Sequence, residues 1–223
     1  MRIRDYILAM SKLIVTTMNG FGSFGDPERE PGTARKYLSH VVNDVLKQSA
    51  PVETVHEIRK GGPGTDEEGE LLQFVLDQYE PNDVYVALGF SWGAYDTTKI
   101  IKRFNRDYRG YMRPTIICGL ADMEWPGGIL AGLFRRKTKR VGPVSAGFNV
   151  YQRGDVLNGA RVRWKLSSGQ SWYGSKPYES ARNVKVTGGD HAGFDTSRPV
   201  QDMVGWCIGT AAGEVLARNR VGG

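Results

Sequence analysis

The chain has 223 residues, of which 40% are hydrophobic, 24% are charged and 29 are glycine, a composition that excludes a disordered or collagen-like protein and is typical of one or at most two globular domains. The net charge of +6 favours anionic partners without selecting one class of them. No run reaches the roughly 18 apolar residues of a transmembrane helix.

The first eleven residues carry Arg2, Arg4 and Asp5, and the apolar run that follows them is too short for the core of a signal peptide. We therefore expect residues 1–11 to be an N-terminal extension and residues 12–223 to form the folded domain. A cytoplasmic protein, or one released without an N-terminal signal peptide, fits this pattern.

The sequence alternates short β-branched runs with amphipathic segments of helical length. In chain order, the pattern predicts a strand at 13–17, a helix at 33–50, a strand at 52–58, a helix at 65–79, a strand at 83–88, a helix at 97–108, strands at 115–120, 144–151 and 184–187, and a helix within 200–217. This alternation predicts an α/β fold with a single, mostly parallel sheet of about six strands and helices on both faces.

Residues 89–93 read Gly-Phe-Ser-Trp-Gly and stand between a predicted strand and a predicted helix. A G-x-S-x-G sequence in this position is typical of a nucleophile elbow, in which the flanking glycines let the chain turn sharply and expose the serine hydroxyl. The alternative is a glycine-rich turn in which Ser91 caps the following helix. Ser91 is the candidate nucleophile.

A serine nucleophile needs a general base, normally a histidine, and the chain has three histidines. His40 falls inside a predicted helix and His56 inside a predicted strand, so both are interpreted as packing or surface residues. His191 follows the last predicted strand in a glycine-flanked loop and comes after Ser91 in the chain. His191 is therefore the candidate base.

This arrangement of a strand, an elbow serine, later carboxylates and a loop histidine resembles the α/β-hydrolase superfamily, in particular its small serine esterases and lipases, and the chain is similar to cutinases in size. The resemblance implies a minimal α/β-hydrolase fold over nearly the whole chain. It also implies that the loop at 19–23, Asn-Gly-Phe-Gly-Ser, corresponds to the esterase segment that begins His-Gly, with Asn19 in place of the histidine. The oxyanion hole would then be formed by the amides of Trp92 and of Phe21, or of Gly22 in place of Phe21.

Two aspartates end predicted strands after Ser91. By the resemblance, Asp155 follows the strand that supplies the triad acid in most members, and it is the favoured acid. Asp122 follows the preceding strand, the position that some lipases use, and is the alternative acid. Asp190 and Asp195 lie too close to His191 in the chain to orient its ring and are interpreted as loop or capping residues.

Residues 123–143 form a long insertion that is apolar and rich in glycine at 125–134 and then carries five positive charges in the six residues 135–140. One interpretation is a lid that docks on an acyl chain or an anionic lipid surface. The other is a short helix packed on the sheet, followed by a solvated basic turn. The aromatic residues between Trp164 and Tyr178 are interpreted either as the lining of an acyl or sugar groove or as loop packing.

The sequence thus predicts a serine hydrolase that cleaves a carboxylic ester with an apolar acyl group, without cofactor or metal and without specific nucleic-acid binding. An anionic lipid or cell-wall surface is a further expected partner. The alternative is a non-catalytic binding protein on the same scaffold, whose basic cluster at 135–140 binds nucleic acid or anionic lipid. Cys118 and Cys207 both lie in apolar runs, which favours buried thiols over a disulfide or a zinc site.

Overall fold

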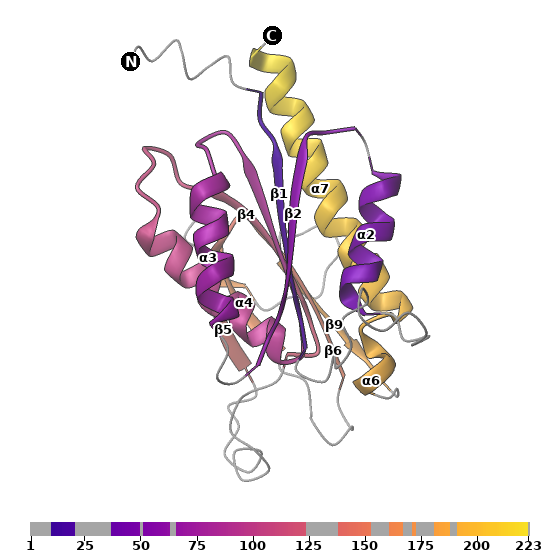
Figure 1. Ribbon diagram of the computed structural model, residues 1–223. Coiled ribbons are helices and arrows are strands. Elements are labelled where there is room, and N and C mark those ends of the chain that lie inside the picture. The colour runs from indigo at the N-terminus through magenta and orange to yellow at the C-terminus, as the bar shows by residue number, and fades with distance from the viewer. Residues whose placement is uncertain are drawn as a thin grey trace.

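The computed structural model describes residues 10–20, 37–49, 51–62, 66–123, 138–152, 161–166, 171–172, 181–187 and 191–222. Its centre is a six-stranded sheet in the order β2-β1-β3-β4-β6-β9, with every neighbouring pair parallel (Figure 1). The strands are β1 (Leu13–Asn19), β2 (Thr54–Lys60), β3 (Val84–Phe90), β4 (Thr115–Ala121), β6 (Ala146–Gln152) and β9 (Ala181–Val186). All six predicted strands are confirmed, with bounds that shift by at most three residues.

The burial of each strand follows from its place in the sheet. β1, β3 and β6 are buried along their whole length, because helices or strands cover both faces of a parallel sheet. β2 is the edge strand beside β1: Thr54, Ile58 and Lys60 are exposed, and its other residues are only partly buried.

Among the described elements, four helices cover the two faces of the sheet (Figure 1). They are α2 (Leu38–Gln48) and α7 (Arg198–Gly222) on one face, and α3 (Glu67–Gln78) and α4 (Trp92–Asp107) on the other. A single helical turn, α6 (His191–Phe194), precedes α7. These helices confirm the predicted α/β class, and none of the described helices is long and apolar enough to cross a membrane.

The structure contains a second, small sheet that the sequence did not predict. It has the order β5-β7-β8 and consists of β5 (Thr138–Val144), β7 (Arg161–Leu166) and β8 (Ser171–Trp172). β5 packs against α4, and β7 lies near β6 and β9, so this sheet covers part of the face that helices cover elsewhere.

Trp164 of β7 is the largest fully buried side chain of the described residues. Its indole lies over Gly147 of β6, where a Cβ atom would come within 3.0 Å of the ring. The groove-lining interpretation is therefore wrong for Trp164, and the packing interpretation is right, because the ring is enclosed between the two sheets.

A buried amide joins the two sheets. Asn183 of β9 accepts a hydrogen bond from the backbone amide of Val162 in β7 (2.9 Å) and donates one to the carbonyl of Val162 (3.0 Å). The side chain of Asn149 in β6 donates a further hydrogen bond to Asn183 (2.9 Å). These bonds give the backbone amide and carbonyl of Val162 a hydrogen-bonding partner in the main sheet.

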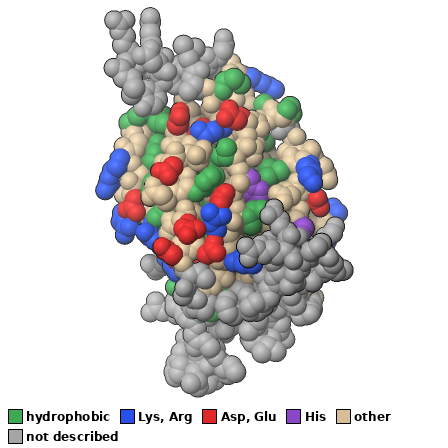
Figure 2. All heavy atoms as spheres, viewed as in Figure 1, with side chains coloured by type: hydrophobic (Ala, Val, Ile, Leu, Met, Phe, Trp, Pro, Cys, Tyr) green, Lys and Arg blue, Asp and Glu red, His purple; other side chains and the backbone are tan. Residues whose placement is uncertain are grey.

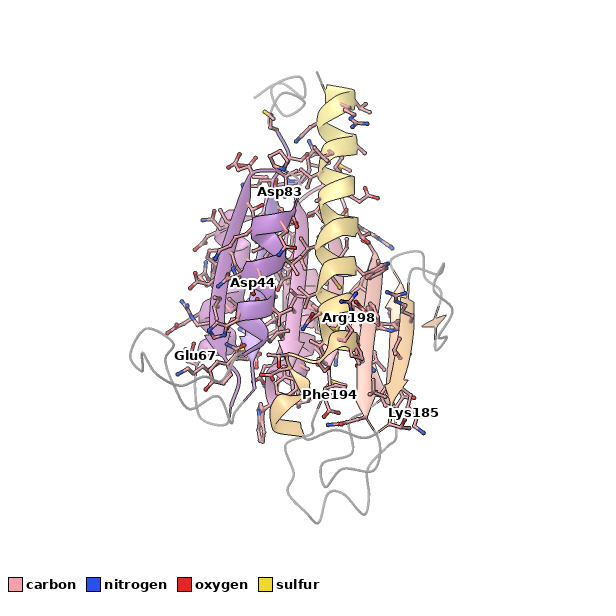
Figure 3. The ribbon with its side chains drawn as sticks, turned by 90° about the vertical axis from the view of Figure 1, so that its right-hand side faces the viewer. Asp44, Glu67, Asp83, Lys185, Phe194 and Arg198 are labelled. Atoms are coloured by element: carbon pink, nitrogen blue, oxygen red, sulfur yellow. The ribbon has the colours of Figure 1, made fainter. Side chains whose placement is uncertain are left out.

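The amino ends of the strands are held by a polar cluster around Asp83 (Figure 3). Asp83 accepts hydrogen bonds from the backbone amides of Lys12 and Glu80 (both 2.9 Å) and pairs with the Lys12 ammonium (3.1 Å). Arg218 of α7 donates to the carbonyl of Asn82 (2.9 Å) and to Thr115 Oγ1 (2.7 Å). The long helix is therefore tied to the end of the sheet at which three strands begin.

Both cysteines are buried and free, as predicted. Cys118 belongs to the apolar core on the α3 and α4 face, whereas Cys207 belongs to the core on the α2 and α7 face.

Replacing Trp164 with alanine should lower the free energy of unfolding by about 3–5 kcal/mol, because a large buried side chain leaves a cavity between the sheets. Tyr111→Ala is the matched control: Tyr111 is 70% exposed, and its loss should change stability by at most about 0.5 kcal/mol. Urea unfolding of both variants measures the difference. Similar effects in the two variants would contradict the burial of Trp164.

His56 should make the protein less stable in acid. Burial lowers the pKa of His56 from 6.5 to about 4, so the unfolded chain takes up a proton between these pH values while the folded chain does not. The stability that His56 contributes is complete above pH 6.5 and is lost progressively as the pH falls to about 4. The stability of the wild type relative to His56→Gln should thus decline by about 3 kcal/mol between pH 7 and pH 4. A difference that does not vary with pH would contradict this.

Candidate functional site

The strand order itself marks one place on the sheet for a ligand. Because β1 lies between β2 and β3, the connection that follows β1 and the one that follows β3 leave on opposite faces, through α2 and α4. Ligands of open α/β sheets bind outside the carboxyl ends of the strands at such a switch point. Ser91, which directly follows β3, lies there.

Ser91 has the backbone of a sharp strand-to-helix turn. Its φ of 55° and ψ of −123° lie in a region that residues other than glycine rarely adopt. Its amide donates a hydrogen bond to the carbonyl of Ala121 at the end of β4 (2.9 Å), and its side chain is 5% exposed. Ser91 occupies the N-cap position of α4, as the alternative interpretation predicted, but its side chain makes no capping hydrogen bond.

Glycines allow the chain segments around Ser91 to pack without side chains between them. A Cβ atom on Gly93 would lie within 3.0 Å of the carbonyl oxygens of Met18 and Asn19, and one on Gly61 would meet the backbone of Gly93. A Cβ atom on Gly20 would lie 2.9 Å from Cβ of Ser91. The ends of β1 and β2 therefore contact the first turn of α4 directly.

Of the two predicted oxyanion donors, Trp92 belongs to the described residues and Phe21 does not. Trp92 directly follows Ser91 and is the first residue of α4, so its amide lies at the start of this helix. Phe21 lies outside the described residues, but its neighbour Gly20 lies against Ser91.

Asn19, at the end of β1, is buried and anchors the start of α2. Its Oδ1 accepts a hydrogen bond from the amide of Ser39, and its Nδ2 donates one to Ser39 Oγ (both 3.2 Å).

His191 is not in an irregular loop, as the sequence suggested, but begins the helical turn α6. Phe194 holds this turn in place, because it is 3% exposed and belongs to the same buried apolar cluster as Phe90. Figure 3 shows Phe194 at the end of the sheet opposite Asp83, which is the carboxyl end. The backbone of His191 therefore lies at the same end as Ser91, while the His191 side chain lies outside the described residues.

The other two histidines have packing roles, as predicted. His40 Nδ1 accepts a hydrogen bond from the backbone amide of Tyr37 at the start of α2 (2.9 Å). His56 Nε2 forms a hydrogen bond with Thr17 Oγ1 in the neighbouring strand (2.9 Å).

Of the two candidate acids, Asp122 is described and Asp155 lies outside the described residues, as does Asp190. Asp122 follows β4 directly, is 0% exposed and also has a positive φ, 44°. Its carboxylate accepts hydrogen bonds from Gln152 at the end of β6. Gln152 was not singled out in the sequence, although a polar residue at the end of an apolar strand is a signal that could have found it.

The predicted lid is corrected in part. Residues 138–143 belong to strand β5, and Val141 is 2% exposed against the α4 side of the core, so they are neither lid nor solvated turn. The apolar segment 125–134 and the basic residues 135–137 lie outside the described residues, and so do the side chains of 138–140.

Charges of both signs are interspersed over the face shown in Figure 2. Lys99 of α4 pairs with Glu68 of α3 (2.6 Å) and with Asp96 (2.7 Å). Burial raises the pKa of Asp96, against the opposing effect of the hydrogen bond from Lys99. Within the described ranges, no three His, Cys, Asp or Glu side chains come close enough together to hold a metal ion.

Comparison with known proteins adds no assignment: no protein-family model matches the chain, and no curated protein matches it.

Replacing Gly93 with alanine should lower the free energy of unfolding by about 1–3 kcal/mol, because the new methyl group would press the first turn of α4 against the end of β1. Gly213→Ala is the matched control, since Gly213 is exposed in α7 with no atom within 4 Å of its added Cβ. That control should be stabilised by about 0.5–1 kcal/mol. Urea unfolding compares the two, and a stabilised Gly93→Ala variant would contradict the close approach.

Proposed function

We propose that the protein is a serine hydrolase of the α/β-hydrolase type that cleaves carboxylic esters. The observation that carries the proposal is the backbone of Ser91, a strained turn between a buried parallel strand and a helix at the switch point of the sheet. Strain of this kind persists only where the surroundings enforce it, and it concentrates at functional sites. The position of α6 supports the proposal, because it brings the His191 backbone to the same end of the sheet as Ser91.

In the proposed reaction, His191 takes the proton of the Ser91 hydroxyl as the serine oxygen attacks the acyl carbon of the ester. The negative charge that develops on the carbonyl oxygen is held by the amides of Trp92 and Phe21. Each such donor lowers the barrier by about 3–4 kcal/mol. An aspartate keeps the imidazole oriented and stabilises its positive charge.

The tetrahedral intermediate then collapses. The bond from the acyl carbon to the alcohol oxygen breaks, and His191 gives its proton to the leaving alcohol. A water molecule, activated by the same histidine, attacks the acyl-enzyme and releases the carboxylic acid with Ser91 restored. All proton transfers are thus made by one imidazole.

The preference for an apolar acyl group rests on the sequence of residues 125–134, and the docking on an anionic lipid or cell-wall surface rests on the basic residues 135–137 next to it. A flap of this composition would bind an apolar acyl chain, and its basic residues would bind an anionic surface.

A fluorophosphonate probe should label the wild-type protein covalently, because the probe reacts with a serine that a neighbouring base activates. Labelling should disappear in Ser91→Ala and in His191→Ala. It should persist in Ser49→Ala and His56→Gln, whose side chains bond to Val45 and Thr17 away from the elbow. Mass spectrometry of the labelled peptide identifies the modified residue.

A folded wild-type protein that the probe does not label would contradict the enzyme proposal. If that protein also bound heparin and lost the binding as salt increased, a non-catalytic role in binding polyanions would be supported instead.

A further inference from the structure

We infer that Asp122 is the carboxylate of this triad and that Gln152 is the positioning residue that orients it. The inference rests on the proposed function and extends it by two assignments. The sequence resemblance favours Asp155, so the assignment has to come from the geometry around Asp122.

Asp122 is built into the site rather than placed on a free loop. It directly follows β4, the strand beside β3, and it is 0% exposed. Among the described residues other than glycine, Asp122 and Ser91 are the two with positive φ. Two residues with positive φ thus directly follow neighbouring strands at the same edge, where backbone strain is a sign of function.

Gln152 holds both oxygens of the Asp122 carboxylate. The Gln152 backbone amide donates a hydrogen bond to Asp122 Oδ1 (3.3 Å), and Gln152 Nε2 donates one to Asp122 Oδ2 (2.9 Å). Gln152 is itself 1% exposed, so its side chain is confined. A carboxylate offers about four acceptor positions, and the two bonds from Gln152 use one position on each oxygen.

Backbone hydrogen bonds connect the strand ends that hold Asp122 and Gln152 to the end of β3, which Ser91 follows. The Ser91 amide donates to the carbonyl of Ala121 (2.9 Å), and the amide of the next residue, Asp122, donates to the carbonyl of Val150 (2.7 Å). The ends of β3, β4 and β6 are therefore joined in sequence. Because Gln152 ends β6, a shift of its side chain would move the Asp122 carboxylate relative to Ser91.

The same contacts would be made by a hydrogen bond that only stabilises the two strand ends. Variants at both residues distinguish this structural role from the orientation of a catalytic carboxylate. The variants are Asp122→Asn, Gln152→Glu and the double variant that carries both. In the double variant, the asparagine amide introduced at position 122 can donate to the glutamate carboxylate introduced at position 152. The hydrogen bond is thereby restored with donor and acceptor exchanged, but the negative charge is at the wrong residue.

The readouts are kcat and KM for p-nitrophenyl butyrate, the rate of fluorophosphonate labelling of Ser91, and the unfolding temperature. Asp122→Asn should lower kcat about 10⁴-fold, as loss of the triad carboxylate does in serine proteases. Gln152→Glu should lower kcat about 10²-fold with little change in KM, because repulsion between two carboxylates displaces the acid. The double variant should regain an unfolding temperature near that of the wild type while its kcat stays at the level of Asp122→Asn.

Recovery of kcat in the double variant would overturn the inference, because it would show that the hydrogen bond matters and the carboxylate does not. A double variant no more stable than the single variants would contradict the hydrogen bond itself. Asp155→Asn is the comparison: a larger loss of kcat there than in Asp122→Asn would assign the acid to Asp155. None of these outcomes affects labelling of Ser91 in the wild type, which tests the proposed function separately.

Discussion

The site depends on one close approach, that of the carboxyl end of β1 to the first turn of α4. Gly93 allows it, because any side chain there would collide with the carbonyl oxygens of Met18 and Asn19. With α4 fixed so closely, the chain leaving β3 has to turn within one residue, and Ser91 adopts a positive φ. The strain is sustained by the hydrogen bond from the Ser91 amide to Ala121 and by the buried strands on either side.

The two ends of the sheet have different roles. At the amino end, Asp83 and Arg218 tie β1, β3, β4 and α7 together through charged and neutral hydrogen bonds. At the carboxyl end, buried polar side chains such as Asp122 and Gln152 follow the strands directly. Because the amino end and the core fix the strands, the strand ends opposite can hold strained and polar residues that would otherwise destabilise the fold.

The elements of the main sheet could be predicted because their signals are local: apolar β-branched runs for strands and 3.6-residue periodicity for helices. β5 was not predicted because it contains Gly142 and Pro143 after a basic run, a pattern that is typical of a turn. In the structure, a shift in register between Arg140 and Pro143 accommodates these residues within the strand. Trp164 was ambiguous for a related reason, since an aromatic side chain fits a groove and a core equally well until its neighbours are known.

The sequence by itself determined the α/β class, the six parallel strands and Ser91 as the residue at the strand-to-helix turn, because each depends on residues that are close along the chain. Only the tertiary structure decided that Gly61 and Gly20 pack around that turn and that Gln152 holds Asp122, thirty residues away. Contacts of that kind depend on which strands become neighbours and on what is buried between them, and no local pattern of residue types specifies either.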